Sequence, residues 1–209
     1  MRSYRQQLSN PALSRAARDQ IADTLAHLED EYGAAPRVSA TTKLDRYVGA
    51  ETSDTYPVPT IRFNATLANG MAARPLNTPA PGPDGVVTST TEGDFSLPDL
   101  PSLVAHEYFH VLQYSLGVEQ AWDFGAELAQ DTWKTLGHVR DDVSHYATSS
   151  PIEFGAELFS LTHGARHYGN TASLPTRTQR AGAKLERWAQ LVGNTLRTST
   201  VTHIKEATQ

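Results

Sequence analysis

Residues 103–112 read LVAHEYFHVL, an apolar run that carries two histidines and a glutamate. Apolar residues on most sides predict a buried central helix. On a helix His106 and His110 lie one turn apart on the same face, so both imidazoles can reach one metal ion. Glu107, next to the first histidine, can address a water molecule bound to that metal. The stretch therefore predicts a helix with two zinc ligands and a general base.

The amino-acid composition limits which classes of protein the chain can belong to. The chain has 209 residues, of which 39% are hydrophobic and 20% are charged, as expected for a globular protein with one sizeable core. It contains no cysteine, which excludes disulfides, thiolate metal ligands and a cysteine nucleophile together. Any zinc ion must therefore be bound by histidines and carboxylates.

The net charge and the hydropathy pattern limit the kinds of partner that the chain is expected to bind. The net charge of −5 and the lack of a lysine- and arginine-rich cluster argue against nucleic acid. No apolar run is long enough to span a membrane, and residues 1–10 lack the apolar region of a signal peptide. We expect a protein or peptide partner, and the sequence leaves the oligomeric state and the compartment open.

The periodicity of apolar residues predicts an α+β fold in one domain, residues 1–209. We expect an N-terminal helix at about 11–32, a β-rich part at about 36–92 and a helical part at about 99–197. A small mixed or antiparallel sheet would pack on the helix that carries the histidines.

Two strands are expected in the β-rich part. Residues 60–67 alternate and are rich in β-formers, and residues 86–91 form the next candidate. Prolines and glycines predict an irregular loop over residues 69–85. Because residues 86–91 precede the histidine-bearing helix, an extended substrate could pair with their free edge.

Four helices are expected in the C-terminal half. Helix-start and helix-stop signals place the first at residues 101–116. The others are expected at residues 119–136, 150–163 and 176–196.

Catalytic zinc needs a third protein ligand, and two glutamates are candidates. Glu127 lies on the next predicted helix, at the distance seen in thermolysin-like and aminopeptidase-like enzymes. The glycine and alanine expected to follow that glutamate are missing, because Leu128 and Ala129 stand there. The other candidate is Glu153.

Residues 144–157 read SHYATSSPIEFGAE. This segment resembles the active-site segment of the anthrax lethal factor-like metallopeptidases, a family that includes the Pro-Pro endopeptidases. The family pattern is Tyr-Ala, a short polar stretch, then Glu-Phe-x-Ala-Glu, and Tyr146, Glu153 and Glu157 keep its spacing. The resemblance covers residues 102–116 and 144–161. Gly155 departs from it, since the family usually has a bulky aromatic residue there.

The resemblance implies a zinc-dependent endopeptidase with a gluzincin-type zincin fold. His106, His110 and Glu153 would bind Zn²⁺, and Glu107 would be the general base. Tyr146 would stabilise the negative charge that develops on the substrate carbonyl oxygen.

Glu157 would orient a metal ligand, because a metal-bound histidine usually donates its second ring N–H to a neighbour.

Other interpretations of the same residues remain open. Ser150 and Glu153 also form a capping box around Pro151, so Glu153 could simply cap a helix. A catalytically inactive zincin fold, in which zinc holds helices together in a binding or structural module, is the alternative function.

Two further histidines, His163 and His167, share the i, i+4 spacing but lack the glutamate between them, and we expect this pair at the surface. His145 is also expected to face solvent.

Overall fold

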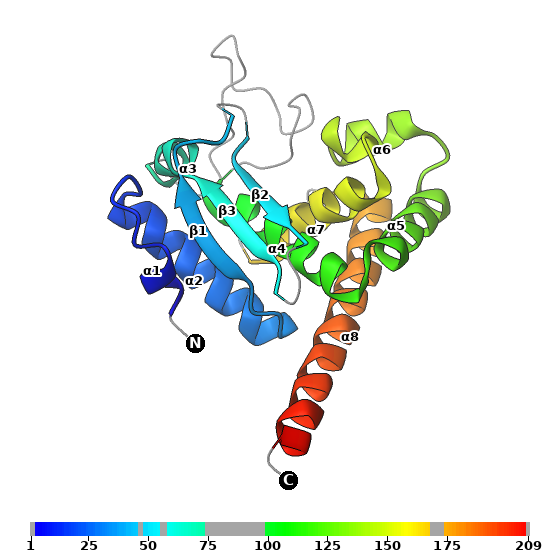
Figure 1. The fold of residues 1–209 in the computed structure, drawn as a ribbon. Helices are drawn as coiled ribbons and strands as arrows, with labels where there is room; N and C mark the ends of the chain where they lie inside the picture. Colours follow the sequence, from blue (N-terminus) through cyan, green and yellow to red (C-terminus); the bar gives the residue numbers. More distant parts are fainter. Residues whose placement is uncertain (1–2, 46–47, 55–57, 74–98, 168–173, 208–209) are drawn as a thin grey trace.

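The computed structural model describes residues 3–45, 48–54, 58–73, 99–167 and 174–207 (Figure 1). These residues form a mixed α+β fold that is mostly helical, with a small three-stranded sheet. The elements, in chain order, are α1 (Tyr4–Gln7), α2 (Arg15–Tyr32), β1 (Arg37–Thr41), β2 (Ala50–Ser53), β3 (Thr60–Asn64), α3 (Ala65–Ala72), α4 (Leu100–Leu116), α5 (Val118–Thr132), α6 (Leu136–Asp142), the 3-10 turn η1 (Tyr146–Thr148), α7 (Pro151–His167) and α8 (Thr176–Ala207).

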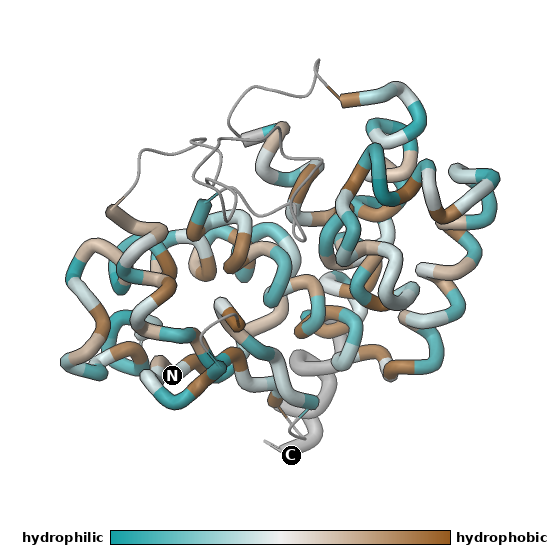
Figure 2. The backbone as a smooth tube through the Cα atoms, turned by 90° about the horizontal axis from the view of Figure 1, so that it is seen from above, coloured by the Kyte–Doolittle hydropathy of each residue, from teal (hydrophilic) through white to brown (hydrophobic). Residues whose placement is uncertain are grey.

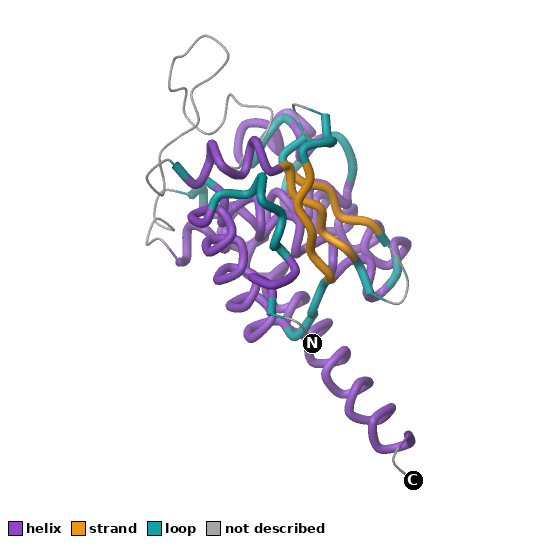
Figure 3. The backbone as a smooth tube through the Cα atoms, turned by 60° about the vertical axis from the view of Figure 1, so that its left-hand side comes forward, coloured by secondary structure: helices purple, strands orange, loops and turns teal. Residues whose placement is uncertain are grey.

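The sheet is mixed, with strand order β1-β3-β2. β3 pairs in parallel with β1 and antiparallel with β2. In β3, Ile61 and Phe63 are buried while Arg62 between them is exposed, so one face of the sheet packs on the helices. The sheet lies on one side of the helical part (Figure 3), and β2 and β3 both contact α4.

Helix α4 is the buried central helix that the sequence predicts. The Asp99 side chain caps it by accepting a hydrogen bond from the backbone N–H of Ser102 at 2.9 Å, and Pro101 follows in the first turn. It ends at Gly117, whose φ of 108° favours glycine. Every residue from position 102 to position 113 is buried. α4 packs against α2 on one side and α7 on the other.

One aromatic contact ties α4 to α7. The rings of Phe109 and Phe159 are stacked with their centroids 4.9 Å apart. Both residues belong to a hydrophobic cluster that also includes buried residues of α2, β3 and α8. The two helices are therefore held in a fixed relation by the core.

Several predicted boundaries are wrong. The strand expected over residues 60–67 ends at Asn64, because the Asn64 side chain accepts hydrogen bonds from the N–H groups of Thr66 and Leu67 and so starts α3. Residues 65–72 are thus helical, although the sequence predicts the end of a strand at residues 65–67 and a loop from residue 69.

The N-terminal helix starts at Arg15, after the capping side chain of Ser14, rather than near residue 11. The second predicted C-terminal helix ends at Thr132, and α6 follows it as a separate helix. Helices α7 and α8 run beyond their predicted ends. The expected strand at 86–91 lies outside the described residues.

The described helices include none that is both long and apolar enough to cross a membrane. Hydrophobic positions recur at intervals along the helices instead of forming long continuous runs (Figure 2). The C-terminal part of α8 extends away from the remaining helices (Figure 1).

Candidate metal centre

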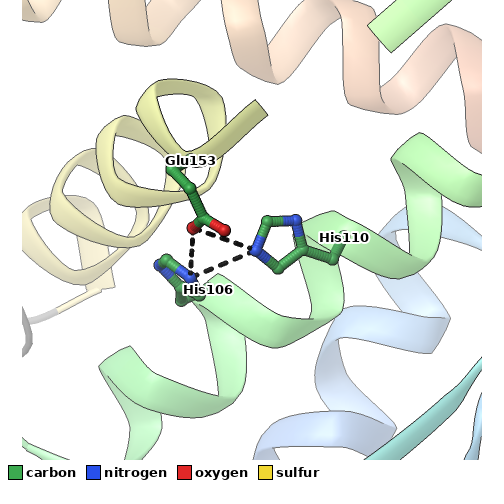
Figure 4. Close-up of side chains that lie close together, drawn as sticks. All are labelled: His106, His110 and Glu153. Atoms are coloured by element: carbon green, nitrogen blue, oxygen red, sulfur yellow. Dashed lines mark hydrogen bonds and ion pairs between the residues drawn. The ribbon is translucent and has the colours of Figure 1, made fainter. Parts of the chain in front are cut away.

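Three side chains from two helices converge at one point. His106 and His110 come from α4, and Glu153 comes from the first turn of α7 (Figure 4). The two Nε2 atoms lie 3.2 Å apart, and each lies 3.3 Å from Glu153 Oε2. Both imidazoles are buried, with side-chain exposures of 5% and 7%, while Glu153 is exposed by 23%.

The spacing of these atoms fits a tetrahedral metal ion. Nitrogen and oxygen ligands about 2.0–2.1 Å from zinc lie about 3.4 Å from one another in a tetrahedral site. The three observed separations are 3.2, 3.3 and 3.3 Å. Charge-assisted N–H···O bonds are shorter, about 2.7–2.9 Å, and Glu153 Oε2 is buried without a hydrogen bond of good geometry. The residues present and their separations are therefore compatible with a zinc ion.

The orientation of His110 is set by Gln113. His110 Nδ1 lies 2.7 Å from Gln113 Oε1, and Gln113 Nε2 donates to the carbonyl of Ile152 at 3.1 Å. Because the amide oxygen is only an acceptor, this contact favours a proton on His110 Nδ1, and a neutral ring would then present the lone pair of Nε2 to the centre. Gln113 is 1% exposed. Its place three positions after His110, on the same helix face, is the signal in the sequence that could have identified it.

Glu157 has the equivalent position beside His106. Its Oε1 lies 3.0 Å from His106 Nδ1, and its Oε2 accepts a hydrogen bond from Ser144 Oγ at 2.7 Å. Glu157 and Ser144 are fully buried. Each imidazole therefore has its Nδ1 beside an acceptor and its Nε2 toward the centre.

The local electrostatics favour a positive charge. Burial opposes protonation of His106, but its contacts with Glu153 and Glu157 outweigh this and raise its pKa to about 10. Burial would likewise raise the pKa of Glu153, yet the two imidazoles hold it well below its usual range. A cation at the point where the three side chains meet would be stabilised by Glu153 directly and by Glu157 through the ring of His106.

Glu107 of α4 and Tyr146 of η1 lie near the candidate metal centre. Glu107, on α4, is 5% exposed and accepts a hydrogen bond from Thr52 of β2. Tyr146, in η1, is half-buried, and its ring centroid lies 6.3 Å from that of His106. Burial and the adjacent Glu153 carboxylate raise the pKa of Tyr146, so its hydroxyl keeps its proton and remains a donor.

The other candidate ligand, Glu127, is not brought to the histidines. It is exposed on α5 and lines a separate hollow that includes Lys184 and Trp188 of α8. In the described part of the chain, the group that could hold a metal is His106, His110 and Glu153.

The capping interpretation of Glu153 is compatible with this arrangement. Ser150 Oγ accepts a hydrogen bond from the backbone N–H of Glu153 at 3.1 Å, so Ser150 caps α7. The Glu153 carboxylate lies at the histidines.

Gly155 is explained by the packing between α4 and α7. A Cβ atom at this position would lie 2.9 Å from Phe109 Cε1 and 3.1 Å from Gln113 Nε2. A larger side chain would displace the amide that orients His110. Gly155 thus differs from the lethal factor-like pattern at a position where Phe109 and Gln113 leave no room for a side chain.

The prediction for His163 is wrong. His163 is 6% exposed, and its ring stacks on Phe159 with centroids 5.4 Å apart. Because α7 continues to His167, His163 lies inside the helix and faces the rings of His27 and Tyr32 on α2. His145 is exposed, as predicted.

Comparisons with known proteins give no family assignment: neither a protein-family model, nor a curated protein, nor a solved structure matches this chain.

Proposed function

We propose that this chain is a zinc-dependent endopeptidase with a zincin-like fold, and that it hydrolyses peptide bonds with an activated water molecule. The observation that carries the proposal is the convergence of His106 Nε2, His110 Nε2 and Glu153 Oε2 within 3.3 Å of one another. Two imidazoles and one carboxylate are a ligand set of catalytic zinc, which keeps a further position for water.

When bound, zinc supplies Lewis acidity, which acidifies water and polarises the substrate carbonyl. Glu107 accepts the proton of the attacking water and then delivers it to the leaving amine. Its place on α4, directly after the ligand His106, supports this role.

Tyr146 donates a hydrogen bond to the substrate carbonyl oxygen as negative charge develops there. Its raised pKa and its position beside His106 and Glu153 support this role. The substrate would be an extended peptide, since β2 borders α4 and pairs only with β3 among the described strands.

The variant Glu107→Gln tests the proposal. It keeps the size of the side chain and all three ligands, so the purified protein should retain about one zinc per chain while peptide hydrolysis falls at least about 100-fold. Hydrolysis is measured on a broad peptide library, and zinc by metal analysis of the same samples. Glu127→Gln, on the exposed side of α5, is the matched control and should behave as wild type.

The same experiment separates the enzyme from the alternative, an inactive module in which zinc holds α4 and α7 together. If wild type binds zinc but is as inert as Glu107→Gln across the library, the enzyme proposal fails. If neither protein binds zinc, the metal centre itself fails.

A further inference from the structure

We infer that Thr52 is a positioning residue for the general base: its hydroxyl fixes one oxygen of Glu107 and leaves the other to exchange a proton with water. This inference rests on the proposed function.

The contact is short and joins distant parts of the chain. Thr52 Oγ1 donates to Glu107 Oε2 at 2.6 Å and also lies 3.2 Å from the backbone oxygen of Glu107. A separation of about 2.5–2.7 Å is typical of a hydroxyl that donates to an ionised carboxylate. Within the described part of the chain, Thr52 is the hydrogen-bond donor that this buried carboxylate meets.

The strand explains why residue 52, and not a neighbour, makes the contact. Side chains alternate along β2, and Glu51 points the other way, where it pairs with Arg62 of β3. The hydroxyl of Ser53 lies 3.5 Å from the carbonyl of Thr60, within the sheet. Threonine is branched at Cβ, so its rotation about χ1 is restricted and its hydroxyl is held in place.

We expect the two carboxylate oxygens of Glu107 to have different roles. A buried carboxylate without a donor is costly and would turn toward any available partner, including the nearby imidazoles. With Oε2 held by Thr52 of β2, rotation of the carboxylate is restricted. Orientation of a general base affects the chemical step and not the binding of substrate, because the substrate does not contact Thr52 Oγ1 in this role.

The kinetic test compares Thr52→Val, which removes the hydroxyl at nearly constant shape, with Thr52→Ser, which restores it. In zinc-loaded protein we expect kcat to fall about 10- to 100-fold in Thr52→Val with KM within about 2-fold of wild type. Thr52→Ser should recover most of kcat, and Ser53→Ala on the same strand should match wild type. Zinc content should be equal in all four proteins. Unchanged kcat in Thr52→Val, or equal losses in Thr52→Val and Thr52→Ser, would overturn the inference.

A second measurement does not depend on activity. The urea midpoint is determined for wild type, Thr52→Val, Glu107→Leu and the double variant, all zinc-loaded; leucine at position 107 has a similar size and no acceptor for the hydroxyl. If the hydroxyl serves the carboxylate, Thr52→Val should shift the midpoint less in the Glu107→Leu background than in wild type. Additive shifts would contradict the contact itself. If the midpoint shifts are not additive but the protein cleaves no peptide, the contact is supported and the proposed function is contradicted.

Discussion

Gln113 holds His110 Nδ1 with one end of its amide and the Ile152 carbonyl with the other. Gln113 lies outside the group that could hold a metal, yet it contacts and orients the ring of His110, a member of that group. At the scale of the residue, we therefore expect the metal affinity of the centre to depend on the residues that contact the ligands as well as on the ligands.

The variant Gln113→Leu should lower zinc affinity about 10- to 100-fold, because His110 loses the acceptor that orients it and a buried N–H is left unpaired. Competition with a chromogenic chelator measures the change. Gln130→Leu, at an exposed position on α5, is the control. Equal affinities in the two variants would contradict the role of Gln113.

The convergence of the three candidate ligands could be predicted from the sequence, but the residues that contact and orient them could not. His106 and His110 follow from helical spacing, and Glu153 from a segment pattern that includes Tyr146. The partner of Gln113 is a backbone carbonyl on another helix, and Thr52 reaches Glu107 from a strand whose inward face the sequence does not reveal. Contacts of this kind depend on how elements pack, which one-dimensional periodicity does not contain.

At the scale of the element, the centre depends on the close approach of α4 and α7. Gly155 permits that approach, since Phe109 and Gln113 occupy the space where its Cβ would lie. The element boundaries that were predicted wrongly have a related cause. Asn64 is compatible with the end of a strand and with a helix cap, and only its hydrogen bonds to Thr66 and Leu67 decide between them.

The variant Gly155→Ala should lower the free energy of unfolding by about 1–3 kcal/mol, because overpacking outweighs the better helix propensity of alanine. Zinc affinity should fall with it as Gln113 moves. Urea unfolding measures the first effect. The control is Gly70→Ala in α3, where an added Cβ meets nothing within 4 Å, and where a gain of up to about 1 kcal/mol is expected. A stabilised Gly155→Ala would show that the packing is looser than described.

At the scale of the whole molecule, the centre joins two helices that belong to one hydrophobic cluster with the sheet, α2 and α8. A ligand that binds only the folded chain stabilises it by mass action, by about 2.7 kcal/mol when free zinc exceeds its Kd 100-fold. The fold itself has a core that does not include the metal.

Removal of zinc by a chelator should therefore lower Tm by roughly 5–10 °C while unfolding stays cooperative. Scanning calorimetry with and without chelator measures the shift. Glu153→Ala should show no chelator-dependent shift, and Glu127→Ala should show the full one. The reverse result would assign the third ligand to Glu127.

The buried partners of the two histidines have a consequence for metal exchange. Gln113, Glu157 and Ser144 lie behind the imidazoles, whose Nε2 atoms face the centre. If the proposed centre holds zinc, a histidine can leave the ion only when its contact with Gln113 or Glu157 is disturbed as well. Exchange of bound zinc for free metal would then be slow, because its rate would be limited by the motion of buried side chains.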